Sequence, residues 1–205
     1  MKLREHLAPG IKAAIMLESK QSTGPPDFDV DVNSIFFKND LMYRHNVLTI
    51  NYTTYDVRRA QDSINPRTEH RNIMLLANVT HHQYRYARVL GIYHANVIYS
   101  GRGRGGKVDH HSRRMEFLWV RWFENINNDS VQQGWQKGRL DALRFHRITS
   151  KEAFGFVDPG DVLRGCHLVP RFLLGKSRNE EGSKARSVCA QEHRDWKSYY
   201  VNRCV

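Results

Sequence analysis

Two stretches of the sequence decide the fold: YARVLGIYHANVIY at residues 86–99 and MEFLWVRWF at residues 115–123. In the first stretch, small or apolar residues recur at every second position from Ala87 to Tyr99. Successive side chains of a strand point to opposite faces, so this period of two predicts a long strand over a core. The second stretch is a dense run of aromatic and apolar residues that also favours a strand. We expect the two to form an antiparallel ribbon, joined by the Gly-rich basic segment 100–114.

Shorter stretches of β-favouring residues flank this ribbon. Residues 43–55 are rich in Val, Ile, Thr and Tyr, and residues 73–77 form an apolar run. Two shorter stretches with β-favouring residues follow at 154–156 and 166–169. Each predicts a strand, and Pro170 is expected to end the last one. The polar residues 56–71 carry the Asn65-Pro66 turn signal and are expected to form the loop between the first two strands.

Helical signals are few. Residues 11–17 predict one short amphipathic helix, and Gly24-Pro25-Pro26 then marks a linker. Asp158 is suited to cap a helical turn that begins at Pro159, and Gly165 is expected to close that turn in a left-handed conformation.

These elements together predict a mainly β fold, because several short strands with polar turns and few helices are typical of small barrels and sandwiches. We expect a short N-terminal helix and linker at residues 1–34 and a small, barrel-like antiparallel module at residues 35–173. The last segment, 174–205, is charged and expected to be mobile. Its aromatic end, around Trp196 and Tyr199, is expected to dock back as a C-terminal element.

The composition favours polyanionic partners. Lys and Arg number 32 against 21 Asp and Glu, which gives a formal net charge of +11. Nucleic acid is the first expectation for such a balance. The sequence has no run of 18 apolar residues, so we expect no membrane partner. Its three cysteines, Cys166, Cys189 and Cys204, form no CxxC pair, and they predict a reducing compartment and no zinc ribbon.

Several long phrases occur in an order that resembles a known family. VLTINYTTYDVRRAQDSINPRTEHRNIMLLA is followed by RYARVLGIYHANVIY, MEFLWVRWF, FGFVDPGDVLRGCHLVPRF and DWKSYYVNR. Over Ile35 to Val205 the chain resembles the C-terminal region of Plavaka and Kyakuja-Dileera-Zisupton transposon-derived proteins of mushroom-forming fungi. This resemblance implies a separated tail of a longer mobile-element protein whose acidic catalytic core lies upstream. The remainder of such a transposase-like protein is then an expected partner, and we expect a nuclear location.

A second, looser resemblance concerns chromatin readers. The order RVLGIYHANV, FLWVRWF and FVDPGDVLRGCHLVP is similar to the strand, strand, helical-turn, strand order of bromo-adjacent homology domains. It implies a barrel-like fold and a chromatin partner. The long basic hairpin at 100–114 departs from those domains, and no methyl-lysine cage is carried over from them.

The strongest candidate binding site is the run GRGRGGKVDHHSRR at residues 101–114. Its glycines let a backbone approach phosphates and its cations neutralise them, and the alternative is a solvated hairpin tip. A second basic set extends the expected surface, so that the candidate nucleic-acid-binding residues are Arg102, Arg104, Lys107, Arg113, Arg114, Lys137, Arg139, Arg144 and Arg147. A further basic set is expected to pair with nearby acids instead, and consists of Arg58, Arg59, Arg67 and Arg71.

Aromatic residues supply a second kind of candidate. Tyr84, Tyr86 and Trp122 are candidate readers that stack on bases or enclose a methylated lysine, and the alternative for each is a place in the core. The histidine pairs lack a third nearby ligand, so we expect no metal and no cofactor.

The expected function is a non-catalytic nucleic-acid or chromatin-binding module, because the sequence contains no GxSxG, Walker or HExxH motif. DNA or chromatin is the expected partner. Two alternatives remain open. One is a protein-interaction scaffold for an upstream transposase region, and the other is a magnesium-dependent nuclease that uses Asp56, Asp62 and Glu69.

Overall fold

A computed structural model describes residues 2–18, 29–53, 59–79, 82–101, 110–126, 141–177 and 195–202. Within these ranges the chain is mainly β, with one α-helix at its N-terminal end, which confirms the predicted class. The chain forms two compact units. The first comprises Met1–His45 and Tyr93–Phe117, and the second comprises Asn46–Ile92 and Leu118–Val205. The sequence-based division at residues 34 and 173 stays a prediction.

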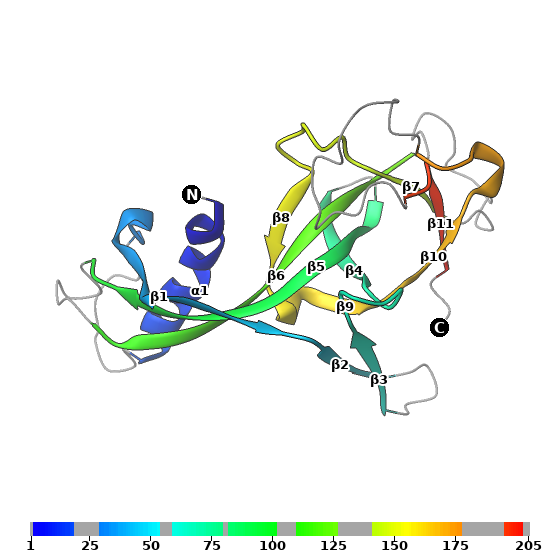
Figure 1. Ribbon diagram of the computed structural model, residues 1–205. Helices are drawn as coiled ribbons and strands as arrows, with labels where there is room; N and C mark the ends of the chain where they lie inside the picture. Colours follow the sequence, from blue (N-terminus) through cyan, green and yellow to red (C-terminus); the bar gives the residue numbers. More distant parts are fainter. Residues whose placement is uncertain are drawn as a thin grey trace. The chain divides into compact units, whose positions relative to one another are not determined.

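The strands follow one another along the chain as Figure 1 shows. They are β1 (Ile35–His45), β2 (Leu48–Thr53), β3 (Arg59–Ile64), β4 (Asn72–Val79), β5 (His82–Tyr99), β6 (Ser112–Asn125), β7 (Ala142–Phe145), β8 (Phe154–Val157), β9 (Val162–Gly165), β10 (His167–Pro170) and β11 (Tyr199–Asn202). The main sheet has the order β10-β11-β7-β6-β5-β4-β9, with β1 paired to β5 and β8 paired to β6. β2 and β3 form a separate antiparallel pair.

The two long strands predicted from the sequence are β5 and β6, and they are neighbours in the sheet. Val89 and Val97 of β5 are 0% and 1% exposed, as the period of two requires. Arg88 and Leu90 on the alternate face of β5 are buried as well. This part of the strand is therefore covered on both faces.

The first unit is built around α1 (Lys2–Glu18). Leu7, Ile11 and Ile15 are its buried residues, and their spacing of four places them on one stripe of the helix. The helix is longer than predicted, since it continues through Pro9. Proline removes a helical hydrogen bond and favours a start after it, but burial of Leu7 stabilises the part of the helix that precedes Pro9.

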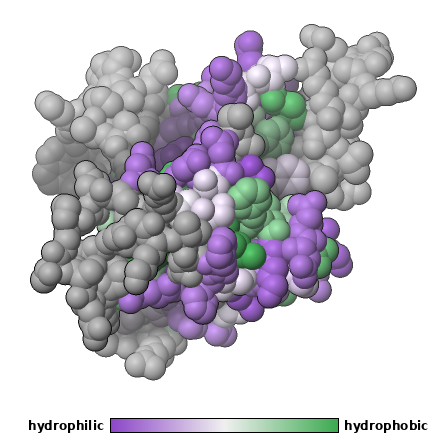
Figure 2. Space-filling view, turned by 90° about the vertical axis from the view of Figure 1, so that its left-hand side faces the viewer, coloured by the Kyte–Doolittle hydropathy of each residue, from purple (hydrophilic) through white to green (hydrophobic). Residues whose placement is uncertain are grey.

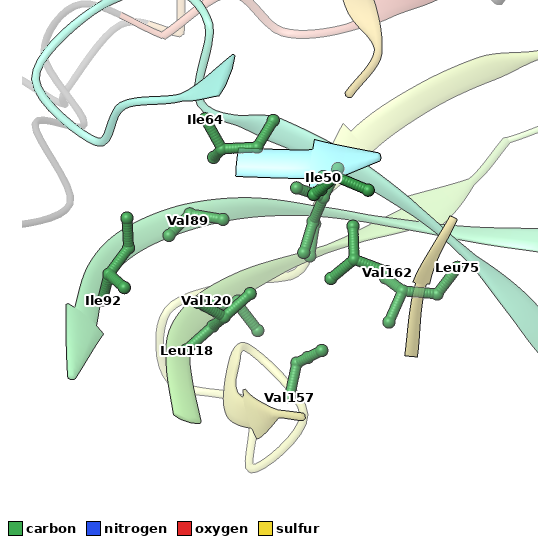
Figure 3. Packing of buried hydrophobic residues seen from close by; sticks show 11 residues of the cluster. Ile50, Ile64, Leu75, Val89, Ile92, Leu118, Val120, Val157 and Val162 are labelled. Atoms are coloured by element: carbon green, nitrogen blue, oxygen red, sulfur yellow. The ribbon is translucent and has the colours of Figure 1, made fainter. Parts of the chain in front are cut away.

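The core of the second unit gathers aliphatic side chains from many strands (Figure 3). The cluster consists of Ile50, Ile64, Ile73, Leu75, Ala87, Val89, Ile92, Leu118, Val120, Val157 and Val162. A second cluster in the same unit is richer in aromatic and sulfur-containing side chains, and consists of Met74, Tyr86, Phe123, Leu143, Cys166, Leu168, Tyr199 and Val201.

The predicted loop at 56–71 is wrong in its first half, because β3 forms there and pairs with β2. The sequence of this strand, RAQDSI, is mostly polar and lacks the alternating apolar residues from which a strand is predicted. Its one large apolar residue, Ile64, is 2% exposed. Packing of Ile64 therefore favours a strand in a segment whose other residues favour a loop. The turn at Asn65 forms as expected, and its side-chain oxygen accepts a hydrogen bond from the Arg67 N–H at 3.0 Å.

The helical turn near the C-terminus forms as the short helix η3 (Pro159–Asp161). Asp158 caps it as predicted, because its carboxylate accepts a hydrogen bond from the Gly160 N–H at 2.7 Å. The turn does not extend to Gly165, which lies opposite Ile73 in the ladder between β9 and β4. A Cβ on Gly165 would lie 3.1 Å from Cδ1 of Ile64. This glycine therefore permits close packing and does not close the helical turn.

The aromatic C-terminal element docks into the sheet, as the sequence suggested. β11 lies between β10 and β7 and is antiparallel to both. Tyr199 and Val201 of β11 are 4% and 1% exposed. Most of the segment predicted to be mobile, 178–194, lies outside the described residues.

Candidate nucleic-acid interface

The basic run at 101–114 connects two neighbouring strands. β5 ends at Tyr99 and β6 begins at Ser112, so the intervening residues join adjacent strand ends. Arg102, Arg104 and Lys107 lie outside the described residues, and their role stays a prediction.

Arg113 lies at the start of β6 and is only 8% exposed. Its Nε donates a hydrogen bond to Oε1 of Glu18 at 3.2 Å, and its Nη2 forms an ion pair with the same carboxylate. The pair connects the last residue of α1 to the second residue of β6. Arg113 is thus a structural cation, because its burial and its carboxylate partner both oppose contact with a phosphate.

Arg114, the next residue, points to the opposite face, and its side chain is 55% exposed. It pairs with Glu116 at 2.8 Å between Nη2 and Oε1. An ion pair between exposed side chains contributes little free energy. Arg114 can therefore exchange Glu116 for an external phosphate at low cost.

Arg114 also acts on a nearby histidine pair. Nδ1 of His94 lies 2.6 Å from Nε2 of His45, and the His94 ring stacks on Tyr43 with a centroid distance of 4.7 Å. Desolvation lowers the pKa of His94, and the like charges of Arg114 and His45 lower it further. The neutral imidazole is thereby favoured beside the base of the basic hairpin.

The second predicted basic set is only partly within the described residues. Lys137 and Arg139 lie outside them, whereas Arg144 and Arg147 are both exposed. Arg144 faces Glu124 across the ladder between β7 and β6, and its Nε lies 2.6 Å from Oε1 of that residue. The weak strand signal at 142–145 concealed this cross-strand partner from sequence reasoning.

In the view of Figure 2 the described surface is mainly hydrophilic, with a hydrophobic area among the hydrophilic residues.

The candidate aromatic readers occupy different environments. Tyr86 is 2% exposed and donates a hydrogen bond from its hydroxyl to Oδ2 of Asp141 at 2.8 Å. It is a core residue, because a ring so deeply buried presents no face to a ligand. Tyr84 is half-buried and packs against the cluster that contains Tyr86.

Trp122 is half-buried and already has a partner on its ring. The guanidinium carbon of Arg85 lies 4.1 Å from the ring centroid, which is cation–π geometry. A Cβ on Gly155 would lie 2.5 Å from the indole Nε1, so the glycine allows the indole to lie close to β8. Contact of Trp122 with a base would require Arg85 to move or to stack together with it.

Two of the three acids of the nuclease alternative line a cavity. Asp62 and Glu69 line a space of about 490 Å³ in the second unit, together with His70 and His167, whereas Asp56 lies outside the described residues. Among the described residues, no group of three or more His, Cys, Asp and Glu side chains is arranged to hold a metal ion.

Asp62 has a structural role. Its Oδ2 accepts a hydrogen bond from the Gly165 N–H at 2.9 Å and lies 3.7 Å from Nε of Arg164. Cys166 also lines the cavity. Its thiol stays protonated, because burial raises its pKa to about 12 and the Asp62 charge adds to the effect. A protonated thiol is a poor nucleophile and a poor metal ligand.

Sequence reasoning missed a buried charge cluster in the second unit. Asp195 accepts hydrogen bonds from Arg88 and from Arg121, the latter at 2.6 Å, and all three side chains are 5–6% exposed. The guanidinium of Arg121 also lies over the Phe145 ring at 3.9 Å, and that of Arg88 at 4.5 Å. Asp195 is separated from its partners by 107 and 74 positions. The sequence around each residue therefore does not predict that they pair.

Two neighbouring groups respond to this environment. Burial lowers the pKa of Arg71, and the like charge of Arg88 lowers it further. Burial raises the pKa of Tyr199, and the charge of Asp195 adds to this effect. These shifts mark a desolvated structural cluster.

Comparisons with protein-family models, with curated proteins and with solved structures found no match to this chain. None of the helices within the described residues has the length and apolar character needed to cross a membrane.

Proposed function

We propose that this chain is a non-catalytic nuclear module that binds nucleic acid or chromatin and derives from a transposase-like mobile-element protein. One observation carries the proposal: the most basic run of the sequence, 101–114, joins the adjacent ends of β5 and β6 in a chain of net charge +11. Phosphate contacts supply most of the affinity of proteins that bind nucleic acid through such basic segments.

The proposal includes a barrel-like, bromo-adjacent-homology-like fold. The two ends of the strand path are β9 and β10, and Cys166 is the one residue between them in the chain. Its N–H donates a hydrogen bond to the Asn72 carbonyl at 2.9 Å, beside the ladder of β9 with β4. This continuity supports a path that returns from β10 to β4, as the strands of a small barrel do.

The proposal is tested by fluorescence anisotropy of labelled duplex DNA over a salt series. Affinity is expected to fall by roughly 0.9 log units per log unit of salt for each phosphate contacted. Replacement of Arg102, Arg104 and Arg114 by Ala is expected to reduce the slope by about 2 to 3 units, in proportion to the contacts removed. Arg113 is kept, because its removal would break the partly buried pair with Glu18.

A matched control removes the same charge elsewhere. Lys2, Arg67 and Lys151 are exposed and are not among the candidate nucleic-acid-binding residues, and their replacement by Ala should leave most of the slope intact. Equal slopes in the two triple variants would remove the hairpin from the proposal. Failure of the intact chain to bind DNA, together with capture of an upstream transposase fragment, would favour the scaffold alternative.

A further inference from the structure

An exposed apolar loop follows β10 in the second unit. The short helix η4 (Phe172–Leu174) presents three consecutive apolar side chains to solvent, with exposures of 67% for Phe172, 98% for Leu173 and 42% for Leu174. Exposure of three large apolar residues in a row is unfavourable in water and commonly marks a contact surface.

The loop is held in place by its backbone. The Arg171 N–H donates a hydrogen bond to the Ser198 carbonyl at 3.0 Å, and the Gly175 N–H donates to the Phe172 carbonyl at 3.0 Å. Further along, the Lys197 N–H donates to the Gly175 carbonyl at 3.2 Å. Gly175 has φ 74°, a left-handed value that glycine adopts without strain. The apolar side chains are therefore displayed by an anchored turn.

Aromatic rings and cations surround the loop. Phe172 meets the Trp196 ring edge to face, with a centroid distance of 5.0 Å. Lys176 lies over the same indole at 5.6 Å, and Arg171 lies over the Tyr200 ring at 4.8 Å. We call Arg171, Phe172, Leu173, Lys176, Trp196 and Tyr200 the C-terminal patch.

The patch is positively charged. The sequence from Val162 to Ser177 contains no Asp or Glu. The one acid in 195–202, Asp195, is 4% exposed and is paired with two buried arginines. Lys197 is exposed beside the patch and adds a further cation. Charge complementarity therefore calls for an anionic partner.

We propose that the C-terminal patch binds single-stranded nucleic acid, with unpaired bases on its apolar and aromatic side chains and phosphates on its cations. Proteins of this kind combine a cationic path for the backbone with aromatic side chains on which bases stack. Phosphates alone would leave Phe172 and Leu173 in water, and an uncharged apolar partner would desolvate Arg171 and Lys176 without compensation. A strand with free bases satisfies both requirements.

This inference rests on the proposed function and assigns a second contact, separate in sequence from the basic hairpin. The test uses the full chain and two labelled probes, a twelve-residue oligothymidine and a twelve-base-pair duplex, in anisotropy titrations. Leu173→Asp places a carboxylate on a side chain that is 98% exposed, so it perturbs the surface and spares the core. Leu76→Asp is the matched control, since Leu76 is 60% exposed on β4 and outside the patch.

Leu173→Asp and Phe172→Ala are each expected to weaken oligothymidine binding about tenfold or more, in line with the loss of one stacked base. Leu76→Asp is expected to change it less than twofold. Neither patch variant should alter the duplex salt slope, which the hairpin triple variant reduces. The two proposals can therefore fail separately. Loss of duplex binding with oligothymidine binding retained would contradict the hairpin proposal, and loss of oligothymidine binding with duplex binding retained would contradict the patch proposal.

Two outcomes would overturn the inference. One is oligothymidine binding that both patch variants leave unchanged. The other is duplex binding by the intact chain without any oligothymidine binding, which would exclude single-stranded nucleic acid as the partner of the patch.

Discussion

Removal of the Asp195 carboxylate is expected to destabilise the second unit strongly. Arg88 and Arg121 are each 5% exposed and share this single carboxylate, with an Nη1–Oδ2 distance of 2.6 Å to Arg121. In Asp195→Ala both guanidiniums remain buried without their counter-ion. Loss of one partner of a buried pair costs about 3–5 kcal/mol, a large share of the roughly 5–15 kcal/mol that stabilises a typical domain.

Urea unfolding, followed by circular dichroism, measures this effect. With a denaturant dependence of about 2 kcal/mol per M, a loss of about 4 kcal/mol lowers the midpoint by about 2 M. Asp195→Asn keeps two polar atoms of the same shape and is expected to lose less. Asp161→Ala provides the control, because Asp161 is exposed and surface substitutions usually stay within about 0.5 kcal/mol. A midpoint for Asp195→Ala within about 0.5 M of the intact chain would refute the reasoning.

Three further predictions concern single ionisable side chains. Burial raises the pKa of Cys166 from 9.0 to about 12. The protonated thiol therefore stabilises the fold below pH 9, and this contribution, on the order of 4 kcal/mol, is lost between pH 9 and 12. Urea unfolding of Cys166→Ala should show a smaller fall in stability over the same pH range. Arg114→Ala is expected to raise the pKa of His94, which NMR titration would report, because one of the like charges that lower it is removed; an unchanged titration would contradict that cause. Asp62→Ala is expected to cost about 1–2 kcal/mol through its lost hydrogen bond from the Gly165 N–H, and magnesium-dependent DNA cleavage that disappears in this variant would establish the nuclease alternative in place of a binding module.

The elements that local sequence predicts are those whose residues agree with their final environment. The run from Ala87 to Tyr99 alternates along nearly its whole length, and β5 forms there. Asp158 and Pro159 stand at the positions that a helical turn favours, and η3 begins as predicted. Local propensity and tertiary packing act in the same direction at these positions.

The failures have a common physical cause, which is packing between distant residues. β3 forms in a polar segment because Ile64 is buried, and α1 extends through Pro9 because Leu7 is buried. The predicted interface is affected in the same way, since the pairing of Arg113 with Glu18 spans 95 positions. The number of cations can be counted from the sequence. Which of them face solvent depends on contacts with residues that are distant along the chain, and the sequence does not reveal these contacts.

The position of β11 has a consequence for the order of synthesis. Residues 199–202 complete the sheet between β7 and β10, and Asp195, which neutralises two arginines of β5 and β6, lies shortly before them in the chain. While the chain emerges from the ribosome, β7 and β10 lack their shared neighbour and present strand edges that can pair wrongly. The second unit therefore acquires its final fold after residue 202 has been released, and a nascent chain held short of that point is expected to need protection by a chaperone.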